Sequence, residues 1–356
     1  MKRIFVIIFA LLPALLFAQS FRVSGTVIDG QTQQPLTGAS VFCQNTTVGT
    51  VTNSNGEFSL TLPPGGYDIV VSFTGYETQS QNINAQTANI TQLKFVLKEK
   101  SKNMEEVAVV ATTEVKNGWE KYGDFFKEQF IGLTENSALC TIENPAALRF
   151  FYSKKKNRLK VIASEDLQIT NKALGYKIRY TLDSFTHEYA SSITQYTGYP
   201  LFEEMEGSAD EQQRWKEKRE EAYLGSVTHF MKSYYEKTLG QEGYKIEFID
   251  NKSNKTRPLN DPYDSSFSMT DGEELELHPP AALRITYLNE TPEQKYLIKN
   301  KLALTNTVQI SQVSFKDAVG VERNGYFYDQ RDLLAIGYWG WEKIADLMPY
   351  DYIPPK

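Results

Sequence analysis

Three histidines are the residues of this chain best suited to binding a catalytic metal ion. Zinc hydrolases use a His-x-x-Glu pair or a His-Glu-x-x-His helix, because these spacings bring two ligands to one metal. The His-Glu-x-x-His pattern does not occur, because no two histidines lie four positions apart. The His-x-x-Glu pattern is absent too, because the residues three positions after His187, His229 and His278 are Ala190, Lys232 and Ala281. We therefore expect no metal site, no cofactor and no peptidase activity.

Acidic side chains are a second source of chemistry, since two opposed carboxylates hydrolyse glycosidic bonds and several together bind calcium. The groups to consider are Glu203-Glu204, Glu220-Glu221, and the loop residues Asp261, Asp264 and Asp271. Adjacent residues do not face each other on a helix, and the aspartates lack the tight spacing of an EF-hand loop. No nucleophile elbow, P-loop or dinucleotide motif is present. The sequence favours a protein that is not an enzyme, with a hydrolase of unrecognised type as a further alternative.

Aromatic side chains gather near the C-terminus, where Tyr338, Trp339 and Trp341 open a segment that ends with Tyr350 and Tyr352. Such rings stack on sugars or anchor a partner protein, so Tyr338, Trp339 and Trp341 are candidate binding residues. The alternative is a structural latch that ends a strand and packs a final turn onto the rest of the chain. The alternation of side chains along a strand favours the latch, because it would place Tyr338 on one face of the strand and both tryptophans on the other.

The elements that position these residues begin with short strands near the N-terminus. Apolar residues with a period of two share one strand face in two runs: Phe58, Leu60 and Leu62, then Tyr67, Ile69, Val71 and Phe73. Turns are predicted at residues 53–56 and 63–66, because Asn and Gly accept the left-handed region and Pro lacks the ladder donor. With the flanking runs, the pattern predicts seven strands between residues 21 and 98, folded as a β-sandwich.

This stretch resembles the carboxypeptidase-like regulatory domain, a transthyretin-like sandwich. The residues that carry the resemblance are Val23–Val27, Pro35-Leu36, Gly38-Ala39, Thr52–Phe58 and Gly75-Tyr76. The resemblance implies a domain without catalytic residues of its own. It also implies kinship with envelope proteins that begin with the same domain, including TonB-dependent transporters of the glycan-uptake type.

Residues 99–112 are expected to form a linker or a connecting strand. In transporters that begin with the same sandwich, a similar stretch contacts the energising protein TonB. Residues 105–111 are therefore a candidate TonB contact, although an ordinary strand is the interpretation that the sequence favours.

Residues 113–356 are predicted to form a second, strand-rich α+β domain, so the fold class is mostly β with a few helices. Helical spacing predicts a helix from Trp119 to Phe130 and one long helix from Ser208 to Leu239, which begins with the capping box of Ser208 and Glu211. Further elements are expected as strands at 148–152, 159–163, 186–197 and 326–328, and as a long loop at 251–271. Short runs here, such as Cys140–Pro145, also resemble envelope proteins known only by the regulatory domain.

Met1–Ala18 has the charged start, apolar run and small final residue of a signal peptide, and the later chain has no apolar run long enough for a transmembrane helix. We expect an exported protein, periplasmic or associated with the outer membrane of a Gram-negative cell. Cys43 and Cys140 either pair there or remain buried thiols. The net charge of −6 argues against nucleic acid as a partner.

The sequence thus predicts a non-catalytic envelope protein that binds or scaffolds another envelope protein or a glycan. An accessory component of a TonB-linked outer-membrane uptake system is the alternative function.

Overall fold

The computed structural model describes residues 20–85, 88–100, 113–250, 253, 255–271, 274–328 and 333–355. In this part of the chain, strands form five sheets and helices are few, which confirms the expected mostly-β class. The predicted signal peptide and the candidate TonB contact at 105–111 lie outside the described residues.

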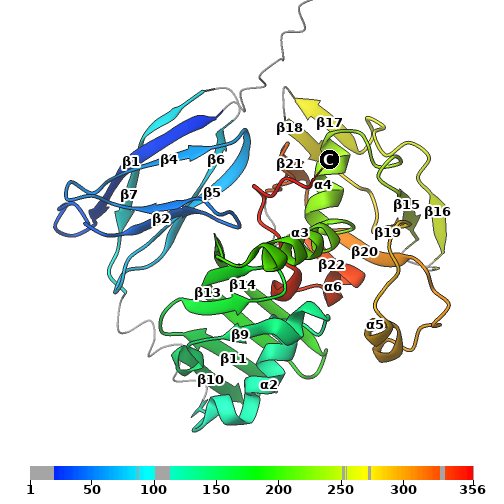
Figure 1. The fold of residues 1–356 in the computed structure, drawn as a ribbon, viewed down its shortest axis with the longest axis horizontal. Coiled ribbons are helices and arrows are strands. Elements are labelled where there is room, and N and C mark those ends of the chain that lie inside the picture. The colour runs from blue at the N-terminus through cyan, green and yellow to red at the C-terminus, as the bar shows by residue number, and fades with distance from the viewer. Residues whose placement is uncertain are drawn as a thin grey trace, which may run out of the picture.

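The N-terminal part is the expected seven-stranded sandwich, drawn in blue in Figure 1. Its strands are β1 (Phe21–Asp29), β2 (Ser40–Cys43), β3 (Gly49–Val51), β4 (Glu57–Leu62), β5 (Gly65–Ser72), β6 (Gln79–Ala85) and β7 (Ile90–Leu97). The sheets have the orders β4-β1-β7 and β3-β2-β5-β6, and side chains from both build one buried cluster. Strand β4 alternates between exposed and buried residues as predicted, with Phe58, Leu60 and Leu62 inside.

Both predicted turns join strands of the sandwich. At residues 53–56, the Asn53 side-chain oxygen accepts hydrogen bonds from the backbone of Asn55 and Glu57, and Gly56 has a φ of 71°. The second turn is shorter than predicted, because β5 already begins at Gly65.

A second sheet lies below the sandwich in Figure 1, in green. It contains β8 (Thr113–Glu114), β9 (Cys140–Ile142), β10 (Leu148–Ser153), β11 (Arg158–Ala163), β12 (Leu167–Asn171), β13 (Tyr176–Glu188) and β14 (Ile193–Glu204), with α2 (Gly118–Phe130) and the short helices η1 (Asn136–Leu139) and η2 (Pro145–Ala147) beside it. The strand order is β8-β10-β11-β13-β12-β9, and β14 pairs with β13. The strand predicted at 186–197 was wrong, because the chain turns there between β13 and β14, and Ser192 has a φ of 55°.

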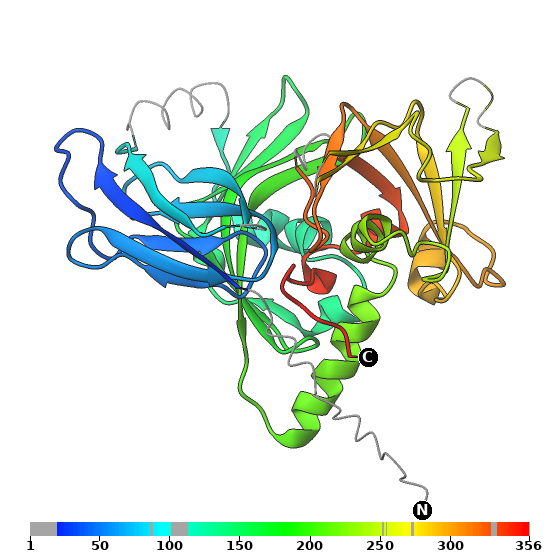
Figure 2. The same ribbon diagram turned by 90° about the horizontal axis from the view of Figure 1, so that it is seen from above.

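The predicted long helix is two helices, α3 (Ala209–Tyr223) and α4 (Val227–Tyr235). The capping box of Ser208 and Glu211 starts α3 as predicted. The break follows from Gly225, whose φ of 78° is incompatible with a continuous helix, and from Ser226, whose hydroxyl caps the second helix. Figure 2 shows the two helices as separate green segments.

The remaining residues build a third part, yellow to red in Figure 1. One sheet has the order β16-β15-β19-β20-β22 and contains β15 (Tyr244–Ile249), β16 (Thr256–Pro258), β19 (Leu283–Tyr287), β20 (Gln309–Phe315) and β22 (Leu333–Gly337). A smaller sheet contains β17 (Ser268–Asp271), β18 (Glu274–Leu277) and β21 (Val319–Val321); the helices are α5 (Gln294–Lys299), α6 (Tyr338–Trp341) and η4 (Ile344–Asp346). The stretch predicted as a loop at 251–271 therefore includes β16 and β17. The strand predicted at 326–328 is only a bridge between Val321 and Phe327.

The region after residue 113 has two large buried clusters rather than one. The first joins α2 and the second sheet to Ala222, Tyr223 and the C-terminal residues Ile344, Ala345 and Met348. The second joins α4 to the inner faces of the third-part sheets and to Trp339. The C-terminal segment thus contributes to both cores.

Candidate functional site

The C-terminal aromatic residues lie inside the protein. Tyr338, Trp339 and Trp341 belong to the helical turn α6 and expose only 4, 8 and 7% of their surface. Trp339 contacts Phe230 and donates a hydrogen bond of 2.7 Å from its indole to the backbone oxygen of Gly225. The predicted alternation was wrong, because a helical turn buries all three rings. This placement favours the latch, and ligand binding by these rings stays a prediction.

A group of carboxylates accompanies α6. The indole of Trp341 donates a hydrogen bond of 3.1 Å to Glu293, while Asp346 accepts bonds from Thr134 and Asn136 at 2.8 and 2.9 Å. Burial raises the pKa of Asp346 to about 6, against those hydrogen bonds. Burial also raises the pKa of Glu342 well above its ordinary value, assisted by the charge of Asp346. Burial therefore makes Glu342 and Asp346 weaker acids than exposed carboxyl groups.

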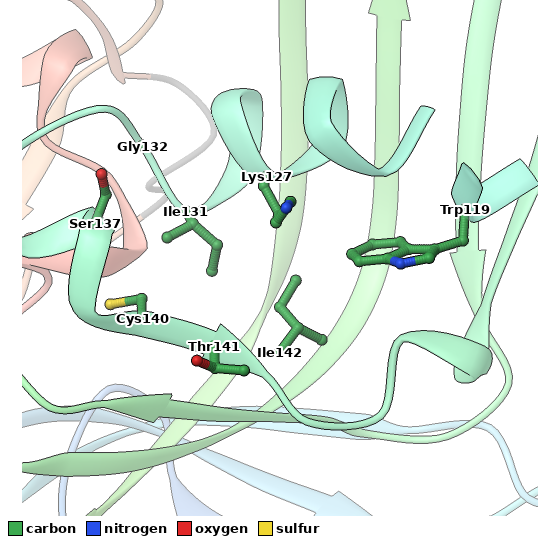
Figure 3. A pocket seen from close by; sticks show the side chains of 8 residues that line it. All are labelled: Trp119, Lys127, Ile131, Gly132, Ser137, Cys140, Thr141 and Ile142. Carbon is green, nitrogen blue, oxygen red and sulfur yellow. The ribbon is translucent and has the colours of Figure 1, made fainter. Parts of the chain in front are cut away.

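The chain also forms a half-open pocket of about 270 Å³ between α2 and β9 (Figure 3). It is lined by Trp119, Lys127, Ile131, Gly132, Ser137, Cys140, Thr141 and Ile142. In Figure 3 the Trp119 ring closes one end and the Cys140 thiol lies toward the other, with Lys127 between them. The pocket thus combines an aromatic ring, one cation and small polar groups.

The position of Trp119 is set by its own helix. A Cβ atom at Gly123 would lie 2.8 Å from the Trp119 ring, so the indole occupies the space that any side chain at 123 would fill. Glycine inside a helix costs about 1 kcal/mol relative to alanine. Here it makes room for the ring, and the W-x-x-x-G spacing is the sequence signal that predicts this wall of the pocket.

The polar groups of the pocket do not form a nucleophile with its base. Burial, and then the charge of Asp346, raises the pKa of Cys140 to about 12, so the thiol is protonated at neutral pH. Ser137 donates its hydroxyl to the backbone of Thr134, and Lys127 forms an ion pair of 2.8 Å with Asp124. The pocket is suited to holding a small molecule against Trp119. Cys140 and Cys43 are both free thiols.

The histidines considered for metal binding lie in three different places. His187 packs against Phe125 and Tyr189, and burial lowers its pKa. His229 is buried beside Tyr244, while His278 lies 3.2 Å from Glu276. Among the described residues, no group of three His, Cys, Asp or Glu side chains is arranged to hold a metal ion.

The acids considered for chemistry have structural partners. Asp261 and Asp264 accept hydrogen bonds from backbone groups two residues later, as turn residues do. Glu204 approaches Arg219 at 3.3 Å, and Glu221 accepts a bond from Lys218. Each of these four acids therefore has a local structural partner, as the sequence analysis favoured.

The sandwich packs against the rest of the chain through the outer face of the sheet that contains β2 and β5. Phe42 and Val70 lie on this face and are completely buried. Arg179 of β13 lies over the Phe42 ring and donates a hydrogen bond of 2.5 Å to Ser40. A parallel bridge joins Thr46 to Leu201 of β14.

Two further segments hold the sandwich. Asn324 donates to the backbone oxygen of Gly66 at 3.1 Å, and the Tyr326 hydroxyl donates to Asp68 at the same distance. Near the C-terminus, the backbone of Tyr350 donates to Asn45 at 2.8 Å. The first domain is thus docked by contacts from three distant stretches of sequence.

Comparison with protein families matches residues 23–109 to the model of the CarboxypepD_reg-like domain. The matched residues include most of the sandwich, which is similar to this family. Two similar curated proteins are the TonB-dependent receptor SusC of Bacteroides thetaiotaomicron, 38% identical over 100 residues, and the TonB-dependent receptor P39 of Formosa agariphila, 37% identical over 99 residues. Each match covers 28% of this chain and 9% of the receptor, so the chain spans a small fraction of the receptors' length.

Among solved structures, one similar chain belongs to a type II cohesin–X-dockerin complex from Acetivibrio cellulolyticus. The match covers 22% of this protein and 58% of that chain, with a TM-score of 0.20 and 23% sequence identity. Within the described residues, no helix is long and apolar enough to cross a membrane.

Proposed function

We propose that this protein is a non-catalytic, exported protein of the cell envelope that binds a protein or glycan partner on a rigid scaffold. The observation that carries the proposal is the similarity of its sandwich to the N-terminal part of TonB-dependent receptors. The buried seating of Phe42 and Val70 adds support, because an apolar face held against the second region fixes the orientation of the sandwich.

The experiment for a protein partner is cross-linking of the tagged full chain in its native cells. The cells are fractionated after treatment with a lysine-reactive reagent, and adducts are identified by mass spectrometry. We expect the chain in the envelope fraction, in one specific adduct. A cytoplasmic chain without adducts, and without glycan binding in the next test, would contradict the proposal.

The possibility that the partner is a glycan is tested at the Trp119 pocket. Trp119 lines the pocket, and an aromatic ring offers the flat apolar contact on which a sugar stacks. We expect glycans retained on an array to be lost by the Trp119→Ala variant. The control is Glu120→Ala, an exposed neighbour on the same helix that does not line the pocket. Equal retention by both variants would exclude this pocket as the glycan site.

An accessory role in a TonB-linked uptake system is the second candidate, favoured by the kind of receptor that the sandwich resembles. We expect the chain to co-purify with a TonB-dependent receptor. Replacement of residues 105–111 by glycine and serine should then reduce its association with TonB, whereas the same replacement of residues 99–102 should not. TonB association unchanged by the first replacement would remove that contact from the proposal.

A further inference from the structure

The outer face of the sheet formed by β19, β20 and β22 exposes aliphatic side chains. Leu334 and Ile336 of β22 are 58 and 52% exposed, and Ile310 of β20 is 38% exposed. Their positions are contiguous, because Ile336 pairs with Gln312 and is therefore diagonal to Ile310. Exposed apolar groups on adjacent strands mark interaction surfaces more often than isolated ones do.

Strand β22 is also the last strand of its sheet in the part of the chain that the structure describes. Its residues Leu333–Gly337 include no charged residue and no proline. Proteins usually protect sheet edges with charged residues or proline, or cover the edge. We name the surface formed by Ile310, Leu334, Ile336 and Arg284 the β22 face.

Arg284 gives this face its charge. It lies on β19 opposite Gln312, in the same row of side chains as Ile336. Its Nε atom is buried without a hydrogen-bond partner, and no ion pair joins it to any described residue. Glu247 is its cross-strand neighbour on β15, but that carboxylate accepts a bond from Thr256 and lies 3.7 Å from Lys245.

We propose that the β22 face binds a partner protein whose contacting surface is apolar and carries a carboxylate opposite Arg284. The inference rests on the proposed function and assigns its protein partner to one surface. An unpaired, half-buried guanidinium within an aliphatic face favours a carboxylate, which it binds in a bidentate manner.

Other occupants fit the face less well. A second copy would present the same surface, where the acid beside Arg284 is Glu247; its side chain is only 14% exposed and already accepts a bond from Thr256. Anionic lipid and nucleic acid require several cations, and the outward positions of β15, β19, β20 and β22 supply two, Lys245 and Arg284. Sugars stack on aromatic rings, and none of the residues that define the face is aromatic.

The test places a photoreactive benzophenone side chain at position 336 or 334 of the full chain in its native cells. The matched control position is Lys94, an exposed residue on β7 of the sandwich. We expect one partner protein to be captured from 336 and 334 but not from 94, through a peptide that contains apolar residues and Asp or Glu.

The charge requirement is tested with two variants of the benzophenone-336 protein. Arg284→Glu should lower the adduct yield at least about tenfold, because a buried like-charge pair replaces an attractive one, whereas Arg284→Lys, which keeps the charge but not the bidentate geometry, should lower the yield less. Unchanged melting temperatures confirm that both variants fold.

Three results would overturn the inference: an adduct with a second copy of the chain, equal capture from position 94, or a yield unaffected by Arg284→Glu. Absence of any adduct at 334 and 336 would also overturn it. If the lysine-reactive reagent still captures a partner in that case, the proposed function stands and only its assignment to the β22 face fails.

Discussion

At the scale of single residues, Phe58 tests the register of the sandwich. It is 5% exposed, and the centre of its ring lies 6.0 Å from that of Phe95 on β7, in the same buried cluster. We expect Phe58→Asp to unfold the sandwich, because an unpaired buried charge costs an amount comparable to the whole stability of a small domain, about 5–15 kcal/mol. Thermal melting followed by circular dichroism measures the loss.

The control for this prediction is the next residue of the same strand. Ser59 is exposed, and its hydroxyl accepts a hydrogen bond from Arg22, a bond that an aspartate would also accept. Ser59→Asp should change the free energy of unfolding by less than about 0.5 kcal/mol. Similar melting of both variants would show that Phe58 is not a core residue.

The partly buried Glu290 should make the stability of the protein depend on pH. Burial raises its pKa to about 7, although the nearby Gln309 amide opposes the shift. No hydrogen bond of ordinary geometry reaches Glu290 Oε2 or either polar atom of the Gln309 side chain. An unfolded glutamate has a pKa near 4.3. The folded state therefore binds more protons than the unfolded state between about pH 4 and pH 7, and the free energy of unfolding falls as the pH rises through that window.

Removing the charge should reverse this loss. We expect Glu290→Gln to melt at least about 2 °C above the parent at pH 8, with the difference vanishing near pH 4. Glu293→Gln is the control, because the Glu293 carboxylate already accepts bonds from Trp341 and from the backbone of Glu135. An equal gain from the control, or a gain independent of pH, would contradict the role given to Glu290.

At the scale of elements, Gly225 separates α3 from α4. Its backbone oxygen accepts the Trp339 indole, and a Cβ atom there would lie 2.8 Å from both Gln309 Oε1 and the Tyr287 ring. We expect Gly225→Ala to lower the free energy of unfolding by about 1–3 kcal/mol, because it adds left-handed strain to this crowding. Chemical denaturation measures the change.

Gly240 provides the comparison for that substitution. A Cβ atom at Gly240 would meet nothing within 4 Å, and the residue is exposed. Gly240→Ala should therefore be nearly neutral. If the two variants were equally stable, the break between α3 and α4 would not need glycine at position 225.

The elements also show what the sequence could predict. Local sequence patterns were sufficient to predict the strands of the sandwich and the capping box at Ser208. Both depend on residues that are neighbours in the sequence. The helix break was missed although Gly225 marks it, since an isolated glycine within a helical pattern is ambiguous. The turn between β13 and β14 was missed although Ser191-Ser192 marks it, because strand-forming residues lie on both sides of it.

Sites built by distant segments could not be predicted in this way. Phe42 and Val70 are buried on the outer face of the sandwich only because β13 and β14 cover it. The pocket at Trp119 requires β9 beside α2, and this pairing leaves no local pattern. Long-range packing, rather than local propensity, decides both features.

At the scale of the whole molecule, the C-terminal segment connects all three parts of the fold. Trp339 belongs to one large cluster, whereas Ala345 and Met348 belong to another. Beyond them, Asp351 accepts hydrogen bonds from Thr47 of the sandwich, and the Met348 backbone accepts one from Asn45 at 3.2 Å. In Figure 2 this red segment passes between the sandwich and the third part.

We therefore expect truncation after Gly337 to disorganise the region after residue 113, since it removes buried side chains from two cores and the link to the sandwich. The truncated chain should be insoluble or should lose its cooperative melt and its slow amide exchange. Truncation after Ile353, a residue that is 81% exposed, is the control and should leave the melt unchanged. A chain ending at Gly337 that stays folded by melt and exchange, yet no longer binds its glycan or envelope partner, would contradict the latch. That result would instead make Tyr338, Trp339 and Trp341 the binding residues.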